Sequence, residues 1–349
     1  MSAPVRFLLA FGAWCCLACG REAAASGRPF EIGIIDFYGL SKVAAGDVRT
    51  ALSFTEGDKV ELLEGPLPEV FTASETRVAH LHGVSAAQVN PVCCDAGRLV
   101  VYVGVQERGA PVLKVRKAPH GGERLAPEVL RAGQQFSQAY LLAVQQGDSA
   151  EDHSQGHALA HDAATRSVQD EFIVFAKRDL PLLKSVLRSS SVAAHRAIAA
   201  QVLGYAPDKQ AVVDDLVFGM SDADAEVRNN AMRSLMVFAE AAPGDRLARL
   251  QIPAEPFIGL LHSPVWSDRN KAAGALMALA TSQDPELLAE LRRSALQPLS
   301  EMARWKSAAH ALPAFLILAR IAGYADDAAA ALFEKGRRDE VIEAAAGTP

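Results

Sequence analysis

The spacing of hydrophobic residues changes along the chain and divides it into two parts. Between residues 28 and 117, stretches of alternating apolar and polar residues, typical of strands, are interspersed with stretches of helical spacing. The pattern predicts strands over 30–37, 84–94 and 99–105, with helices over 45–54 and 68–82 between them. The predicted order is β-α-α-β-β, which is that of a small α/β module.

A helical spacing dominates after this module. Proline, glycine and polar residues at 118–124 predict a linker between two domains. The region 125–190 is then predicted to hold lead-in helices, over 127–146, 157–177 and 180–188, with a polar loop at 149–156.

Residues 191–345 contain an internal repeat. Each copy has an arginine, an alanine three positions later and a leucine four positions after that. The clear copies are Arg196, Ala199 and Leu203; Arg228, Ala231 and Leu235; and Arg269, Ala272 and Leu276. A degenerate fourth copy is anchored at 321–325, which is similar to 202–206. Each copy follows a polar turn, in which Asp224 is a predicted helix N-cap, and another apolar helix precedes each turn.

These helix pairs resemble HEAT-like repeats, including their short bacterial type. The resemblance is carried by the turn aspartates, Val227-Arg228 and the alanines. It implies an all-α, right-handed superhelical solenoid, in which small alanines let paired helices approach closely and leucines fill the layer between pairs. We interpret the arginines as structural residues that span from one turn to the next and pair with acidic groups such as Asp224. Three to four copies are enough for a stable stack of this kind.

The first module resembles the POTRA domain, a periplasmic protein-interaction module. The resembling positions are the first strand running into Gly39, then Lys42-Val43, Gly57-Asp58, Gly83-Val84 and the hairpin turn 95–97 before a strand that ends at Glu107. No alternating β-barrel segments follow, so a role in barrel assembly is not expected.

The POTRA resemblance implies a mode of binding. Members of that family accept a partner strand at the open edge of their sheet, where unpaired main-chain groups supply hydrogen bonds. Here the open edge would be the strand 84–92, with the main chain of Gln88, Val89 and Asn90 as the partner-binding positions. The alternative is that the module only caps the helical part.

The composition of the chain argues against several classes of function. The 349 residues carry 35 Lys and Arg against 41 Asp and Glu, a net charge of −6, which argues against non-specific nucleic-acid binding. Half of the residues are hydrophobic, so the chain can build a sizeable core and lacks the signature of disorder. Aromatic residues are only 6% of the chain, which disfavours a base-stacking platform.

The N-terminus is predicted to be a targeting segment, residues 1–25. Arg6 precedes an apolar run over 7–18 that is too short to span a membrane but typical of a signal peptide. Two exits are open. Ala23-Ala24-Ala25 is a signal-peptidase site, and Leu17-Ala18-Cys19-Gly20 resembles a lipobox in which Cys19 is the lipidation candidate. We therefore expect an exported protein of a Gram-negative bacterium, either free in the periplasm or anchored by a lipid.

Two cysteines lie outside the targeting segment, Cys93 and Cys94. Adjacent side chains in a strand point to opposite faces, so a disulfide between them would need a distorted turn. We expect instead that one of them packs inward as a small hydrophobic residue.

Three histidines, His153, His157 and His161, are spaced four apart, which on one helix would place them on one face. They are weak candidates for a metal site, because the glutamate of an HExxH motif is missing and His153 falls in a predicted loop. The opposing interpretation is a solvated or core-lining set. No dinucleotide, P-loop, nucleophile-elbow or EF-hand motif is found, so no catalytic residue and no cofactor is predicted.

The sequence thus favours an exported, non-enzymatic scaffold or adaptor that binds protein or peptide partners in the cell envelope, through the sheet edge and the concave face of the solenoid. No nucleic-acid partner is expected, and membrane attachment only through an N-terminal lipid. The alternative is a metal-binding or lyase-like factor that uses the histidines, because some bacterial HEAT-like proteins resemble lyases that attach pigments to proteins.

Export predicts a processed N-terminus. Mass spectrometry of the protein from its native envelope should find either an acylated Cys19 or an unmodified chain that starts at Ser26. An intact terminus at Met1 or Ser2 on that protein would contradict export.

Overall fold

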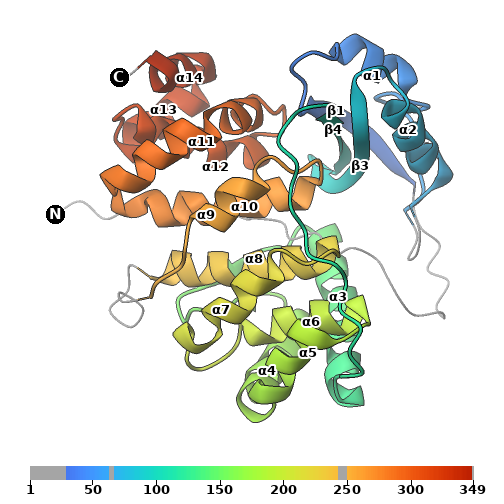
Figure 1. Ribbon diagram of the computed structural model, residues 1–349, viewed down its shortest axis with the longest axis vertical. Helices are drawn as coiled ribbons and strands as arrows, with labels where there is room; N and C mark the ends of the chain where they lie inside the picture. The colour runs from blue at the N-terminus through green and yellow to red at the C-terminus, as the bar shows by residue number, and fades with distance from the viewer. Residues whose placement is uncertain (1–28, 63–66, 243–249, 348–349) are drawn as a thin grey trace.

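The computed structural model describes residues 29–62, 67–242 and 250–347. A small mixed sheet with two helices comes first, and almost all of the remaining chain is helical (Figure 1). Within these ranges, no helix combines the length and apolar character needed to cross a membrane.

The sheet follows the predicted order with one addition. Its elements are β1 (Phe30–Tyr38), α1 (Ala45–Ala51), β2 (Lys59–Val60), α2 (Glu69–Ala79), β3 (Val84–Asp95) and β4 (Arg98–Glu107). The strands lie in the order β2-β1-β4-β3, with β1 parallel to β4 and β3 antiparallel to β4. The two-residue strand β2 was not predicted, because a segment so short has no periodicity.

Both faces of the sheet are covered. On one face, Ile35, Val101 and Val103 pack with Val48 of α1 and Phe71 of α2. The other face packs against the helical region through Tyr38, Val92, Val100 and Tyr102. This double burial explains the unbroken apolar run of β4, since a strand covered on both sides needs hydrophobic residues at every position. The sheet is therefore the middle layer between its own helices and the rest of the protein.

Cys93 and Cys94 form a disulfide with each other. They lie where the pairing of β3 with β4 shifts register between Val92 and Asp95, next to the hairpin turn. The prediction of one free cysteine packed inward was wrong, because the irregularity at the end of the strand releases both side chains from the alternation of a regular strand.

The helical region begins after an extended linker. Its elements are α3 (Pro127–Gln145), β5 (Glu151–Asp152), β6 (Leu159–Ala160), α4 (Ala163–Arg178), α5 (Leu180–Ser189), α6 (Ala193–Leu203), α7 (Gln210–Gly219), α8 (Ala225–Ala241), α9 (Glu255–Leu260), α10 (Trp266–Leu279), a 3-10 turn (Ala280–Ser282), α11 (Pro285–Ala303), α12 (Ala308–Ile321), α13 (Asp326–Glu334) and α14 (Arg338–Gly347).

The predicted helix over 157–177 starts later than expected. The α4 helix begins at Ala163, where the carboxylate of Asp162 accepts a hydrogen bond from the Thr165 N–H at 2.7 Å. The residues before it form a short hairpin, in which β6 pairs with β5. A good N-cap residue fixes the start of a helix, and here it lies five residues beyond His157.

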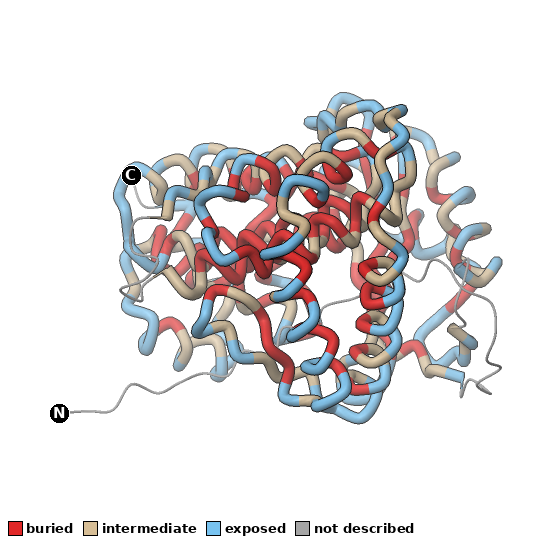
Figure 2. The backbone as a smooth tube through the Cα atoms, turned by 90° about the horizontal axis from the view of Figure 1, so that it is seen from below, coloured by how far each residue is buried: buried red, intermediate tan, exposed pale blue. Residues whose placement is uncertain are grey.

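From α5 to α12 the helices form two layers. Helices α6, α8, α10 and α12 pack in sequence, each against the next, and α5, α7, α9 and α11 pack on one side of them. Figure 2 shows buried residues concentrated along the helices where these layers meet. The alanines and leucines of the repeat, such as Ala231 and Leu235, are fully buried there.

Three buried arginines make the same interactions in successive units. Each donates to the main-chain carbonyl six residues earlier, in the turn before its own helix. Each also donates to a carboxylate further along the chain. Arg196 binds the Ser190 carbonyl at 2.8 Å and Asp222; Arg228 binds the Asp222 carbonyl at 2.9 Å and Asp268; Arg269 binds the Ser263 carbonyl at 2.7 Å and Glu301.

The carboxylates of these pairs differ from the predicted one. Asp224 does not bind an arginine; it caps α8 by accepting from the N–H groups of Glu226 and Val227. Asp222, two residues earlier, takes the arginine, with its oxygens 2.7 and 2.8 Å from the guanidinium of Arg196. An N-cap carboxylate is already committed to its own helix, which leaves the neighbouring aspartate of the turn for the contact between units.

Candidate functional site

We call the side of α8 and α10 opposite α7 and α9 the inner face; it is an interior region, because every residue of α10 from Trp266 to Met277 is buried. Ala231 of α8 packs on Gly219 of α7, so Asn229, two positions earlier in a helix of 3.6 residues per turn, lies on the other side. Asn270 holds the same place on α10, because Asn229 directly follows Arg228 and Asn270 directly follows Arg269. The two repeats thus present an asparagine at equivalent positions.

These asparagines are buried and incompletely bonded. Asn229 is 6% exposed and Asn270 is 2% exposed, and the Oδ1 atoms of both lack a hydrogen-bond partner. Trp266, one turn before Asn270 on the same face of α10, is also buried, and its Nε1–H is unpartnered. A buried polar atom without a partner costs about 1–3 kcal/mol of stability.

The sheet borders the inner face at Trp266. The ring of Tyr102 stacks on Trp266 with centroids 5.5 Å apart and lies 4.7 Å from the ring of Trp305. The Tyr102 hydroxyl is hydrogen-bonded to Nδ1 of His310 at 2.8 Å, and burial lowers the pKa of His310 to about 4. Oδ1 of Asn90 in β3 accepts from the main-chain N–H of Trp266 at 3.4 Å. These contacts fix the position of Trp266, and thereby of α10, relative to the sheet.

The β5–β6 hairpin covers the other end of the inner face, over the C-terminal half of α8. Arg233, one turn after Asn229, donates to both carboxylate oxygens of Glu151 at 2.6 Å. Nδ1 of His153 lies 2.5 Å from the carboxylate of Glu240, and its Nε2 lies 3.5 Å from Glu151. An extended segment of the chain is therefore clamped onto this face by its charged side chains.

The clamp shifts the pKa values of its members. Burial alone would lower the pKa of His153, but the contacts with Glu151 and Glu240 outweigh it and raise the pKa to about 9. Burial would raise the pKa of Glu151, but Arg233 and His153 lower it to about 2. Glu151 and His153 are therefore both charged near neutral pH.

The structure does not bring the three histidines together. His153 is held by two glutamates, and His157 packs against the ring of Tyr205, where burial lowers its pKa to about 4. His161 is exposed and follows the hairpin. The helix that would have aligned them begins only at Ala163, and among the described residues no group of three or more His, Cys, Asp or Glu is placed to hold a metal ion.

The predicted partner-binding positions, residues 88–90, lie on an edge strand of the sheet, but their main chain is not free of other contacts. Strand β3 is one of the two outer strands of the sheet, the other being β2. The N–H of Val89, which points away from β4, already donates to the Glu75 carboxylate of α2 at 3.0 Å, and the Gln88 side chain contacts the same carboxylate. Asn90 is buried against α10. The interpretation of 88–90 as an open edge was therefore incomplete, because the sequence gives no sign that Glu75 reaches the strand.

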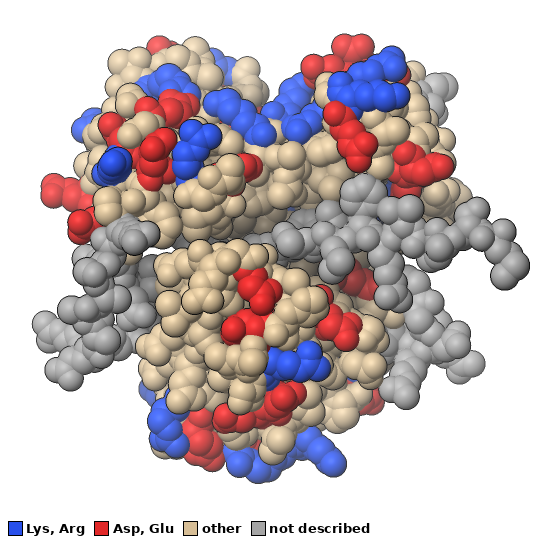
Figure 3. Space-filling view, turned by 180° about the vertical axis from the view of Figure 1, so that it is seen from behind, with Lys and Arg blue, Asp and Glu red and all other residues tan. Residues whose placement is uncertain are grey.

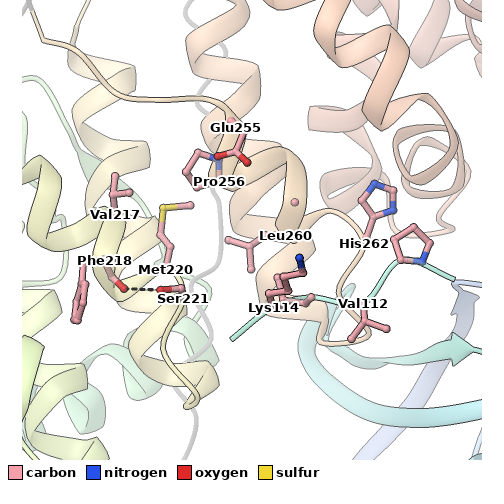
Figure 4. Close-up of a pocket in the computed structure, with 13 residues that line it drawn as sticks. Val112, Lys114, Val217, Phe218, Met220, Ser221, Glu255, Pro256, Leu260 and His262 are labelled. Carbon is pink, nitrogen blue, oxygen red and sulfur yellow. Dashed lines mark hydrogen bonds between the residues drawn. The ribbon is translucent and has the colours of Figure 1, made fainter. Parts of the chain in front are cut away.

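A pocket of about 540 Å³ lies where the extended linker between β4 and α3, here its residues 111–114, passes between α7 and α9 (Figure 4). Its walls are mainly apolar, from Val112, Met220 and Leu260, with Lys114 and Glu255 among the lining residues. Arg116 ties the linker to the end of α7, donating to the carbonyl of Phe218 at 3.0 Å and to Ser221. This pocket could not be predicted from the sequence, because it depends on an extended segment that has no periodic pattern.

No protein-family model matches this chain, and neither does any curated protein. Its function is therefore inferred from the residues themselves. Cys19 and the cleavage site at 23–25 lie outside the described residues.

The hairpin clamp makes a prediction about pH. Because the pKa of His153 is higher in the folded protein than its ordinary value of 6.5, protonated His153 stabilises the fold. This contribution is complete below about pH 6.5 and is lost as pH rises through about 9. The free energy of unfolding of the parent should therefore exceed that of His153→Gln at pH 6, and the difference should shrink by pH 10.

Urea unfolding at four pH values between 6 and 10 measures this difference. His161→Gln, at an exposed position of the same segment, is the control and should differ little from the parent at any of these pH values. A parent–His153→Gln difference that stays constant from pH 6 to pH 10 would show that His153 is not protonated in the clamp.

Proposed function

We propose that this protein is an exported, non-enzymatic scaffold or adaptor that binds protein or peptide partners. The observation that carries the proposal is the set of three arginines with the same pair of interactions, which repeats from α6 to α11. A repeated contact between neighbouring units is what a stack of repeats requires, because each unit contacts only its neighbours. It supports a HEAT-like, right-handed solenoid for residues 191–345.

A stack of helical repeats is well suited to binding a partner along its length. Equivalent positions of successive helices line a continuous surface, and solenoid proteins bind partners along that surface. The row of helices α6, α8, α10 and α12, each packed on the next, would supply such equivalent positions. Figure 3 shows that on the side opposite to Figure 1 the basic and acidic side chains are interspersed, which supports a protein partner over a nucleic acid.

The strand order of the first module supports a POTRA-like domain. Strand β3 lies at the edge, where such a domain would accept a partner strand. The face of the sheet that carries Tyr102 packs on Trp266 of α10 and His310 of α12. This contact also supports the alternative role, in which the module caps the helical stack. Both roles are compatible, since the edge and the face of a sheet are different surfaces.

The location that fits this function is the cell envelope, as a periplasmic protein or as a lipoprotein attached through Cys19. The targeting segment predicted for residues 1–25 supports it. The alternative function, a metal-binding or lyase-like factor, is less favoured. It would require His153 to leave Glu240 and His157 to leave Tyr205.

Two proline variants and one glutamine variant test edge binding. Gln88→Pro removes an N–H that points toward β4, so it should lower stability by breaking the ladder. Val89→Pro removes only the N–H that binds Glu75, so it should keep the fold and reduce partner capture. Glu75→Gln weakens the cover of the edge and should increase capture.

Capture is measured by crosslinking in intact cells, followed by pull-down from the envelope, with circular dichroism as the check on folding. Failure of the parent to retain any envelope protein would contradict the adaptor function. If folded Val89→Pro and Glu75→Gln both capture as the parent does, strand addition is excluded and the helical stack remains as the binding surface.

A further inference from the structure

The pocket between α7 and α9 continues into an exposed, apolar stretch of the linker. The volume of the pocket, about 540 Å³, is within the usual range for a ligand site. Beside it, Val112 is 70% exposed, more than any other large hydrophobic residue in the described ranges, and Val115 is 45% exposed. An open apolar pocket with an apolar strip next to it forms an elongated surface, which suits a peptide segment better than a small molecule.

The main chain of the linker beside the pocket is available for pairing. No N–H or C=O group from Val112 to Val115 makes a hydrogen bond with another described residue. The next residue, Arg116, holds the segment in place. Its N–H donates to the Ser221 carbonyl at 2.6 Å, and its guanidinium lies 3.4 Å from the centroid of the Phe218 ring. An extended segment that is anchored and has unpaired main-chain groups can accept a second extended chain.

The linker is also positively charged. Its residues 108–122 include four Lys and Arg and no Asp or Glu. The guanidinium of Arg116 lies 3.7 Å from Asp222, whereas Lys114 and Lys117 are exposed and make no ion pair with a described residue. Figure 4 shows Glu255 at the opposite end of the pocket from Lys114. Two unpaired ammonium groups at one end of an apolar pocket complement carboxylates that flank an apolar side chain.

We propose that the pocket between α7 and α9, together with the linker beside it, binds an acidic, extended segment of a protein partner. One apolar side chain of the partner enters the pocket. Neighbouring carboxylates lie against Lys114 and Lys117, and the partner's main chain pairs with residues 112–115. This inference rests on the proposed function and names the chemistry of the partner and the place where it binds.

A peptide selection provides the probe. The full-length chain is used to select from a phage-displayed library of random 12-residue peptides, and the most enriched peptide is synthesised with a fluorescein label. The enriched peptides should carry net negative charge around a large apolar residue. Affinity is measured by fluorescence anisotropy, and the affinity of the parent should fall as salt rises, because exposed charges are screened.

A glycine of the pocket allows the pocket to be filled without damage to the fold. Gly259 lies one turn after Glu255 and Pro256 on the pocket side of α9, and a Cβ there would meet no packed neighbour within 4 Å. Gly259→Leu should therefore weaken peptide binding about ten- to hundredfold, because it occupies the space of the partner's side chain. Leucine is the better helix former, so the midpoint of thermal unfolding should stay or rise.

Gly46→Leu is the matched control, because Gly46 is also an exposed helical glycine with no packed neighbour near its Cβ, but lies in α1. It should bind the peptide as the parent does. Lys114→Glu and Lys117→Glu should each weaken binding about three- to tenfold. Lys335→Glu, at the exposed C-cap of α13, makes the same change of charge away from the pocket and should have little effect.

Three results would overturn this inference: no peptide is enriched, the enriched peptides lack net negative charge, or Gly259→Leu binds as the parent does. Sedimentation provides a fourth, since a dimer that Gly259→Leu dissociates would assign the pocket to a second copy of the chain. Capture of an envelope protein by the parent would in each case still stand as independent support for the adaptor function, so the two failures can be told apart.

Discussion

Buried arginines that bind the turn of their own unit and a carboxylate of the next one hold this protein together. A guanidinium presents several donors in a fixed plane, so one side chain can satisfy a carbonyl and a carboxylate at once. Arg196 and Arg228 show how the units connect. Asp222 accepts from Arg196 through its carboxylate and from Arg228 through its main-chain carbonyl. The spacing of the helices therefore depends on these charges being paired, because an unpaired buried charge is strongly destabilising.

The third arginine, Arg269, links the helices to the sheet. The carboxylate of Glu301 accepts from Arg269 at 2.9 Å and from the Gly39 N–H, at the end of β1, at 3.2 Å. The guanidinium of Arg269 also lies over the ring of Tyr38, 4.4 Å from its centroid. The aromatic contact of Tyr102 with Trp266 and Trp305 adds apolar area at the same boundary. The sheet and the helices thus share one packed interior, and the inner face has a fixed border.

The sequence predicts what depends on local periodicity and misses what depends on contacts between distant residues. Strands β1, β3 and β4 and most helices follow from apolar spacing and glycine turns. The pairing of Arg228 with Asp268 could not be read from spacing, because Asp268 lies on another helix and nothing marks it apart from Asp224. The same holds for Glu75 on the edge strand. The start of α4 was misjudged for a different reason, since His157 and His161 have a helical spacing that the Asp162 cap overrides.

The asparagines of the inner face are a similar case. Asn229 and Asn270 are visible in the sequence as the residues after two repeated arginines, but only the structure shows that they are buried without partners for Oδ1.

The central claim, that the arginines fix each unit to the next, is tested most directly by a double-mutant cycle on Arg228 and Asp268. Urea unfolding of the parent, Arg228→Met, Asp268→Leu and the double variant gives the coupling free energy. Each single variant leaves one charge buried alone and should lose about 3–5 kcal/mol, whereas the double variant should recover most of that loss. The exposed pair Arg304 and Asp339 is the control, with an expected coupling of about 0–1 kcal/mol. A coupling between Arg228 and Asp268 no larger than that of the control would contradict the account.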